Sequence, residues 1–147
     1  MVEAKITLTQ PQGTTRQFVV SNNRGHHFLI DDPTGASGPK PTELIAAGLG
    51  GCTAFDVITI LRKKRQQVTG YQVEVIGDQA QGTPAVFTGF TVKHIITGVD
   101  IDPKAVEEAI RLSEEKYCSV GLTLAKAVPI KAVYEIIPAD VPEPATV

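Results

Sequence analysis

The sequence predicts one mixed domain in which strands and helices follow in the order strands, helix, strands, helix, strand. Its 147 residues suffice for a single domain with a sizeable core. Residues 42–66 and 102–118 have helical character, and alternating or β-branched runs lie before, between and after them. The domain is expected to span residues 1–137. A proline-rich, flexible tail is expected at residues 138–147.

Three strands are predicted before the first helix, at residues 2–9, 16–21 and 27–31. Asn-Asn-Arg-Gly at residues 22–25 has the chemistry of a hairpin turn between the last two. The segment 32–41 carries three prolines and two glycines, which predicts a loop.

The first helix is predicted from an N-cap at Thr42 to about Gln66. It is apolar enough to suggest a membrane span, but Asp56 and three glycines interrupt it, which favours a helix buried in protein. Each glycine costs about 1 kcal/mol relative to alanine in a helix interior. We therefore expect another backbone to approach this helix closely, such as the helix of a second copy in a homodimer.

The second half of the chain alternates again between strand and helix patterns. Strands are predicted at residues 71–78 and 86–97. Asp102 and Pro103 suit the N-cap and first position of the second helix. A short helix at residues 120–127 and a final strand at residues 130–137 complete the domain.

Composition and charge exclude several classes of function. A net charge of −2 argues against a nucleic-acid or anionic-membrane surface. The first residues have no apolar signal-like region, so the cytoplasm is the expected compartment. In that compartment the two cysteines are expected to be reduced, with any disulfide transient.

Cys52 and Cys118 are the candidate functional residues, because each lies in an apolar, structured segment. They are either two parts of one redox device or two inert core residues. Asp56 follows Cys52 by one helical turn. A bare carboxylate there disfavours a thiolate, so Asp56 is either neutralised, a structural residue with a satisfied carboxylate, or an acid or base in its own right.

The histidines do not predict a metal site. Structural zinc usually comes with a close pair of ligands in the sequence, and this chain has no such pair. His94 is expected to be a strand residue whose ring is satisfied. No metal and no cofactor is predicted.

The segments P-T-E-L-I-A-A-G-L-G-G-C and K-Y-C-S-V-G-L resemble the OsmC/Ohr family, the osmotically inducible and organic hydroperoxide resistance proteins. The resemblance extends from about residue 5 to residue 137. C-T-A-F-D-V-I-T-I-L and L-S-E-E-K-Y-C-S-V look most like the YhfA-like branch.

This resemblance implies an α+β fold in which antiparallel sheets wrap around central helices in an intertwined homodimer. It also implies that Cys52 is the peroxidatic cysteine and attacks an organic hydroperoxide, and that Cys118 is the resolving cysteine. The resulting disulfide would be reopened by a dithiol reductant, such as a lipoyl protein. A disulfide requires the two Cα atoms to lie within about 7 Å.

The family activates its first cysteine with an arginine and a glutamate, and here the sequence departs from the pattern. The glutamate stands ten positions before the cysteine in the family, where this chain has Thr42; Glu43 stands nine before. Nine residues is a rotation of about 900°, which places Glu43 opposite Cys52 on an ideal helix. Arg16 is the first candidate for the arginine and Arg24 the second.

The sequence thus predicts a cytoplasmic, homodimeric thiol peroxidase that uses Cys52 and Cys118, with Arg16, Glu43 and Asp56 as further candidates. Two alternatives remain open. One is a non-catalytic relative that binds a small apolar or electrophilic ligand at the dimer interface, and the other is a redox sensor. No nucleic-acid or membrane partner is predicted.

Overall fold

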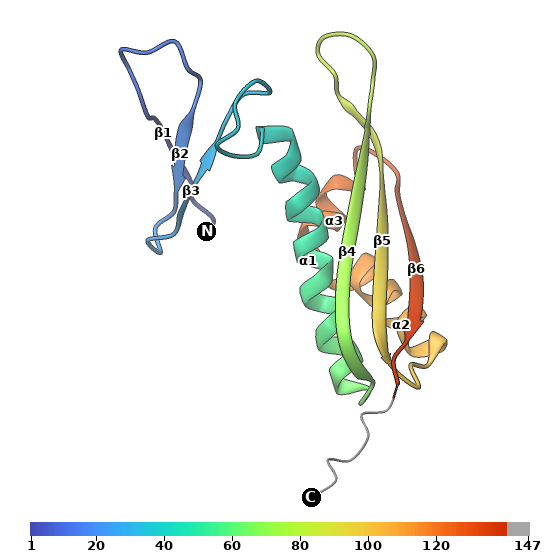
Figure 1. Cartoon of the computed structure of the whole chain (residues 1–147). Coiled ribbons are helices and arrows are strands. Elements are labelled where there is room, and N and C mark those ends of the chain that lie inside the picture. The colour runs from blue at the N-terminus through green and yellow to red at the C-terminus, as the bar shows by residue number, and fades with distance from the viewer. Residues whose placement is uncertain (141–147) are drawn as a thin grey trace, which may run out of the picture. The chain divides into compact units, whose positions relative to one another are not determined.

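The structure is a computed structural model that describes residues 1–140. The chain divides into two compact units, Met1–Ile45 and Ala46–Val147 (Figure 1). Each unit carries one three-stranded sheet.

The N-terminal unit is an antiparallel meander of β1 (Lys5–Leu8), β2 (Phe18–Ser21) and β3 (His27–Ile30). The predicted turn between β2 and β3 is present, and Gly25 adopts a φ of 82° that favours glycine. Only Ile30 and Asp31 are buried in this unit, whereas Phe28 is 47% exposed. This small sheet therefore has almost no core of its own.

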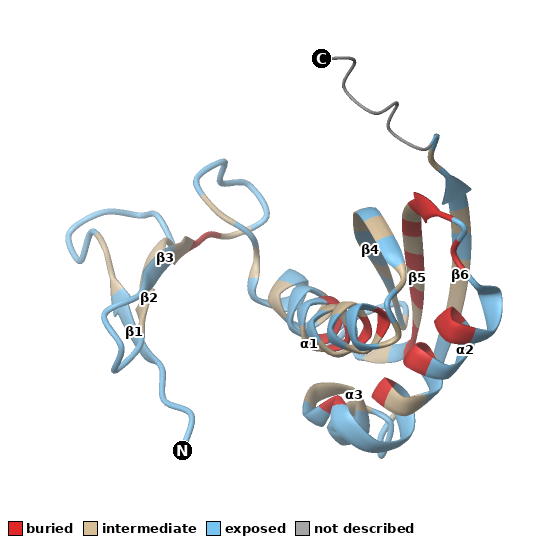
Figure 2. Ribbon diagram, turned by 90° about the horizontal axis from the view of Figure 1, so that it is seen from below, coloured by how far each residue is buried: buried red, intermediate tan, exposed pale blue. Residues whose placement is uncertain are grey.

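The C-terminal unit contains β4 (Gln67–Gln79), β5 (Phe87–Val99) and β6 (Ile130–Pro138), in that spatial order. One face of its sheet is covered by helices, with β5 buried in the middle (Figures 1 and 2). The helical elements are α1 (Pro41–Lys63), α2 (Pro103–Leu112), the π-helical turn η1 (Ser113–Tyr117) and α3 (Ser119–Leu124).

The expectation of purely antiparallel sheets is wrong for this unit. β4 and β5 pair antiparallel, but β5 and β6 pair parallel. The chain leaves the end of β5, passes through α2, η1 and α3, and returns to start β6 beside the beginning of β5. Such a helical crossover joins parallel neighbours.

The α1 helix begins two residues earlier than an N-cap at Thr42 predicts. Pro41 is the first helical residue, a position that tolerates proline because its missing N–H has no partner in a helix. Thr42 therefore lies inside the first turn and is not the N-cap. The helix ends at Lys63, before Arg65 takes up a left-handed φ of 57°.

One stripe of α1 is buried: Leu49, Thr53, Val57 and Leu61 follow at intervals of four. The helix is long and apolar enough to cross a membrane by length and composition. Leu49, Val57 and Leu61 of this stripe belong to the two hydrophobic core clusters of the fold.

The glycines of α1 differ in their surroundings. A Cβ atom at Gly50 would meet Val75 Cγ2 of β4 at 2.8 Å, so the close neighbour there is a side chain of the sheet and not the expected second backbone. Beyond the helix's own backbone, no atom of residues 1–140 is found within 4 Å of such a position at Gly48 or Gly51. The face of α1 that carries Gly48 and Gly51 is thus exposed in the described residues of the single chain.

The second helix starts as the sequence predicts. The Asp102 carboxylate accepts a hydrogen bond from the Lys104 backbone N–H at 2.9 Å, and Pro103 is the first helical residue. The predicted short helix is present as α3, but it ends at Leu124. Within the tail predicted at residues 138–147, Pro138 closes β6, and residues 141–147 lie outside the described residues.

Candidate active site

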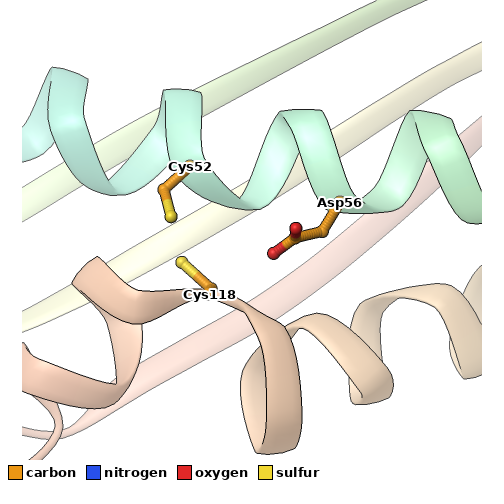
Figure 3. Close-up of side chains that lie close together, drawn as sticks. All are labelled: Cys52, Asp56 and Cys118. Atoms are coloured by element: carbon orange, nitrogen blue, oxygen red, sulfur yellow. The ribbon is translucent and has the colours of Figure 1, made fainter.

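The fold brings three functional groups of the C-terminal unit together. The sulfur atoms of Cys52 and Cys118 and a carboxylate oxygen of Asp56 all lie within 4.8 Å of one another (Figure 3). Sixty-six positions of sequence separate the two cysteines, so their proximity is a product of the tertiary fold. The two sulfur atoms lie near each other, as a redox pair requires.

Two local features position these groups. Cys52 and Asp56 are four residues apart on α1, so their side chains lie on one face of the helix. Cys118 follows η1, where its backbone N–H donates to the Ser113 carbonyl at 2.9 Å. It then takes an extended conformation as the N-cap of α3, and its Sγ accepts from the Gly121 N–H at 3.2 Å.

The two thiols have different environments. Cys118 is only 2% exposed, whereas Cys52 is half-buried, with the Ser119 hydroxyl 3.9 Å from its sulfur. Burial raises the pKa of Cys118 to about 11, and the neighbouring Cys52 sulfur adds to the rise, while the Gly121 N–H opposes it. Cys118 is therefore a thiol at neutral pH, and Cys52 is the more accessible sulfur.

Asp56 belongs to a chain of hydroxyl groups. The Ser113 hydroxyl donates to Asp56 Oδ2 at 3.0 Å, and Ser113 Oγ lies 2.9 Å from the Thr53 hydroxyl. A hydroxyl group can donate only one hydrogen bond, and Ser113 donates its hydrogen bond to Asp56. In the contact between Ser113 and Thr53, Thr53 is therefore the donor. The Asp56 carboxylate is thereby held in place beside the two sulfurs.

Sequence reasoning missed Thr53 and Ser113, although a signal was present. Thr53 occupies the buried stripe of α1 one turn from Leu49 and Val57. Ser113 continues the apolar stripe of α2 at the spacing Val106, Ile110, Ser113, and it is fully buried. A polar residue at a core position of an amphipathic helix needs a hydrogen-bond partner.

The other sequence candidates, Arg16 and Glu43, belong to the N-terminal unit and make local contacts there. Arg16 is 73% exposed and pairs with Asp32 at 3.2 Å. The Glu43 carboxylate accepts from the Lys40 backbone N–H at 3.0 Å, as expected of a first-turn helix residue. The thiol cluster itself is built from the C-terminal unit.

A cavity of about 260 Å³ lies next to Cys118. Most of its wall is apolar, from α1, α3, β5 and β6, and a few polar groups interrupt it. The lining residues are Leu49, Thr53, Val92, His94, Ser113, Glu114, Cys118, Gly121, Ala125, Val128, Pro129, Ile130 and Ala132. A cavity of about 150 Å³ can hold benzene, so this one has room for a larger aromatic or branched alkyl group.

His94 is, with Cys118, a buried titratable group in the wall of this cavity. Its Nδ1 lies 2.7 Å from the Tyr71 hydroxyl, so the sequence expectation of a satisfied ring is confirmed. Burial lowers the pKa of His94 to about 4, and burial followed by the Asp56 charge raises the pKa of Tyr71. Tyr71 and His94 are thus both neutral at neutral pH, and their hydrogen bond joins the phenol hydroxyl to Nδ1 of the ring.

Residues 34–133 match the model of the family described as OsmC-like protein. The chain belongs to the OsmC-like family. It is 40% identical over 122 residues to Protein YhfA of Escherichia coli strain K12. The aligned residues cover 83% of this chain and 91% of YhfA.

Solved structures share the OsmC-like fold. The crystal structure of a hypothetical protein from Aquifex aeolicus VF5 superposes with a TM-score of 0.82 at 26% identity, covering 95% of this chain and 98% of that one. The organic hydroperoxide resistance protein OhrB of Bacillus subtilis superposes with a TM-score of 0.61 at 16% identity, covering 92% and 98%. At that identity OhrB supports the fold alone.

Proposed function

We propose that this OsmC-like protein is a thiol-dependent peroxidase that reduces organic hydroperoxides through Cys52 and Cys118. The observation that carries the proposal is the proximity of the two sulfurs, within 4.8 Å, beside a largely apolar cavity. A disulfide needs a sulfur–sulfur separation of about 2 Å, so a small movement of the side chains would join them.

The difference between the two thiols supports their order of action. Cys52 is the more accessible, and Cys118 is buried with a raised pKa. The Cys52 thiolate attacks one peroxide oxygen, the O–O bond breaks, and the alkoxide takes a proton and leaves as an alcohol. Cys52 is then a sulfenic acid.

Cys118 completes the cycle by attacking the Cys52 sulfur. The S–S bond forms, the S–O bond breaks, and hydroxide leaves as water after taking a proton. For this step the Cys118 thiol must lose its proton, and the Asp56 carboxylate is near enough to accept it. One hydroperoxide and two thiols thus give one alcohol, one water and one disulfide, which an external dithiol such as a lipoyl group reduces.

The cavity supports an organic rather than an inorganic peroxide as the substrate. Apolar side chains such as Leu49, Val92 and Ile130 offer contact to an alkyl or aryl group, which hydrogen peroxide lacks. An organic hydroperoxide gains this contact in addition to the reaction at sulfur.

We further propose that the protein works as a homodimer in the cytoplasm. Two surfaces of the single chain lack cover that a second copy would supply. The outward stripe of α1 presents Gly48, Gly51 and Phe55, and Phe55 is 77% exposed. The N-terminal sheet also buries almost nothing by itself. Gly48 and Gly51 would permit the close helix contact expected from the sequence.

The test is turnover of cumene or tert-butyl hydroperoxide with dihydrolipoamide as the reductant. The wild-type protein is expected to consume both, and Cys52→Ser to lose turnover. Cys118→Ser should stop at a sulfenic acid that a dimedone reagent traps. Turnover that survives Cys52→Ser would contradict the proposal.

The cavity also favours a second candidate function, the non-catalytic binding of a small apolar or electrophilic ligand. The two functions differ in one measurement. A binding protein does not consume cumene hydroperoxide. It keeps its affinity for cumyl alcohol, the alcohol that reduction of this hydroperoxide would give, after Cys52→Ser. A redox sensor, in turn, oxidises once and does not turn over.

A further inference from the structure

The thiol cluster has the composition of a metal site when carboxylates are counted as ligands. Cys52 and Asp56 supply the close pair that the cysteines and histidines alone do not, because they are four residues apart on α1 and share one face. The fold adds Cys118 as a third donor from the start of α3. Figure 3 shows both sulfurs and the carboxylate directed into the same space between these elements.

The distances suit a small tetrahedral ion. Zinc binds thiolate at about 2.3 Å and carboxylate oxygen at about 2.0–2.2 Å, so its donors lie roughly 3.5–3.8 Å apart. The three donor atoms here all lie within 4.8 Å of one another. A contraction of at most about 1.3 Å, within reach of side-chain rotation, would bring them onto one ion.

The carboxylate donor, Asp56, is already held in position by a hydrogen bond. Ser113 donates to Asp56 Oδ2 at 3.0 Å, and Oδ1 makes no hydrogen bond to any residue from 1 to 140. Such support of a ligand by a further hydrogen bond is typical of metal sites, because it fixes the ligand's orientation. Asp56 can therefore offer Oδ1 to an ion and keep its bond to Ser113.

The charges of the cluster match a cation once the ion has displaced the two thiol protons. The three donors then carry three negative charges. In the described residues 46–140 their hydrogen-bond partners are the hydroxyls of Ser113 and Ser119 and the N–H of Gly121, with no lysine, arginine or histidine among them. A divalent ion would reduce the net charge of the cluster to −1.

We propose that the reduced protein binds one zinc-like divalent cation through Cys52, Asp56 and Cys118. Two sulfurs and one oxygen select a borderline or soft ion such as Zn²⁺ or Cd²⁺ over Mg²⁺ or Ca²⁺. Three protein donors leave a fourth position for water. Binding releases the two thiol protons.

Metal binding and peroxide reduction compete for the same sulfurs, and this part of the inference rests on the proposed function. One hydroperoxide and two protons convert the metal-bound dithiolate into the disulfide, an alcohol, a water and the free ion. The ion is thus held by the reduced protein and released on oxidation.

The experiment is a titration of the full-length, reduced protein with Cd²⁺ in the absence of oxygen, followed by thiolate-to-metal absorption in the ultraviolet. Zn²⁺ affinity is obtained by competition with a chromogenic chelator. We expect one ion per chain, loss of binding in Cys52→Ser and Cys118→Ser, and at least tenfold weaker binding in Asp56→Asn. Asp78→Asn is the matched control, because Asp78 is an exposed aspartate on β4 outside the cluster; the affinity of this variant should equal that of the wild type.

Asp56→Asn is nearly isosteric and retains an acceptor for Ser113, so it tests the ligand with little disturbance of the fold. X-ray absorption of the zinc-loaded wild-type protein gives a second measurement that needs no variant. It should show two sulfur ligands at about 2.3 Å and at least one oxygen at about 2.0–2.2 Å. Equal affinity of Asp56→Asn and the wild type, or no saturable binding, would overturn the proposal.

The titration contains no peroxide, and the turnover assay is run with a chelator. Failure of the metal proposal is therefore distinct from failure of the peroxidase proposal.

Discussion

Acidification should destabilise this protein through His94, which is only 1% exposed. Burial lowers the pKa of the folded imidazole from its ordinary 6.5 to about 4, so the unfolded chain binds this proton more readily than the folded one. The stabilising contribution is complete above pH 6.5 and is lost as the pH falls towards 4. The difference of 6.5 − 4 = 2.5, at about 1.36 kcal/mol per pH unit, sets the full effect at about 3 kcal/mol.

The assay is urea denaturation of the wild type and of His94→Gln between pH 7.5 and pH 4. Glutamine is neutral throughout, and its side-chain amide can accept from or donate to the Tyr71 hydroxyl, which lies 2.7 Å from His94 Nδ1 in the wild type. Loss of stability from other titrating groups is common to both proteins. We expect the wild type to lose about 3 kcal/mol more than the variant over this range. Parallel losses in the two proteins would refute the argument that His94 is buried as a neutral ring.

Three further results are expected from the surroundings of the thiols. Because Cys118 is buried with a pKa of about 11, iodoacetamide at pH 8 should alkylate Cys52 at least tenfold faster, as read by peptide mass analysis; equal rates would contradict the assigned order. Phe55→Lys should raise the dimer dissociation constant about 100-fold in sedimentation experiments. Phe55 is exposed in the single chain, and the dimer would lose the burial of two such rings, one from each copy, at roughly 1.5 kcal/mol each. An unchanged constant would place the interface elsewhere. Ala132→Leu narrows the cavity and should raise the KM for cumene hydroperoxide. Ala127→Leu is the control, because Ala127 is exposed and does not line the cavity, and this variant should keep the wild-type KM. Equal KM values for the two variants would exclude the cavity as the substrate site.

Much of the fold could be predicted because its local signals agree with the tertiary structure. Asp102 and Pro103 begin α2 as their chemistry dictates, and the strands recur near their predicted positions. The parallel pairing of β5 and β6 could not be predicted from the strand patterns. Alternation shows which residues share a face of a strand, but it carries no information about the direction of the neighbouring strand.

The candidate site was predictable in part for a similar reason. Cys52 and Asp56 share one helical face, which follows from their spacing alone. The position of Cys118 depends on η1, and a π-helical turn has no clear sequence signal. Ser113 had a sequence signal as a polar residue continuing the apolar stripe of α2, but its contacts with Thr53 and Asp56 depend on the packing against α1. The cavity wall likewise depends on how α1, α3, β5 and β6 pack together. The metal-site inference arises from this packing, because the third donor is distant in sequence.

The most direct test of the account is mass analysis of the reduced, full-length protein after addition of one equivalent of cumene hydroperoxide. The account predicts loss of both thiols, a mass decrease of about two hydrogen atoms, and a peptide that joins Cys52 to Cys118. Retention of both free thiols, with the hydroperoxide unconsumed, would contradict it.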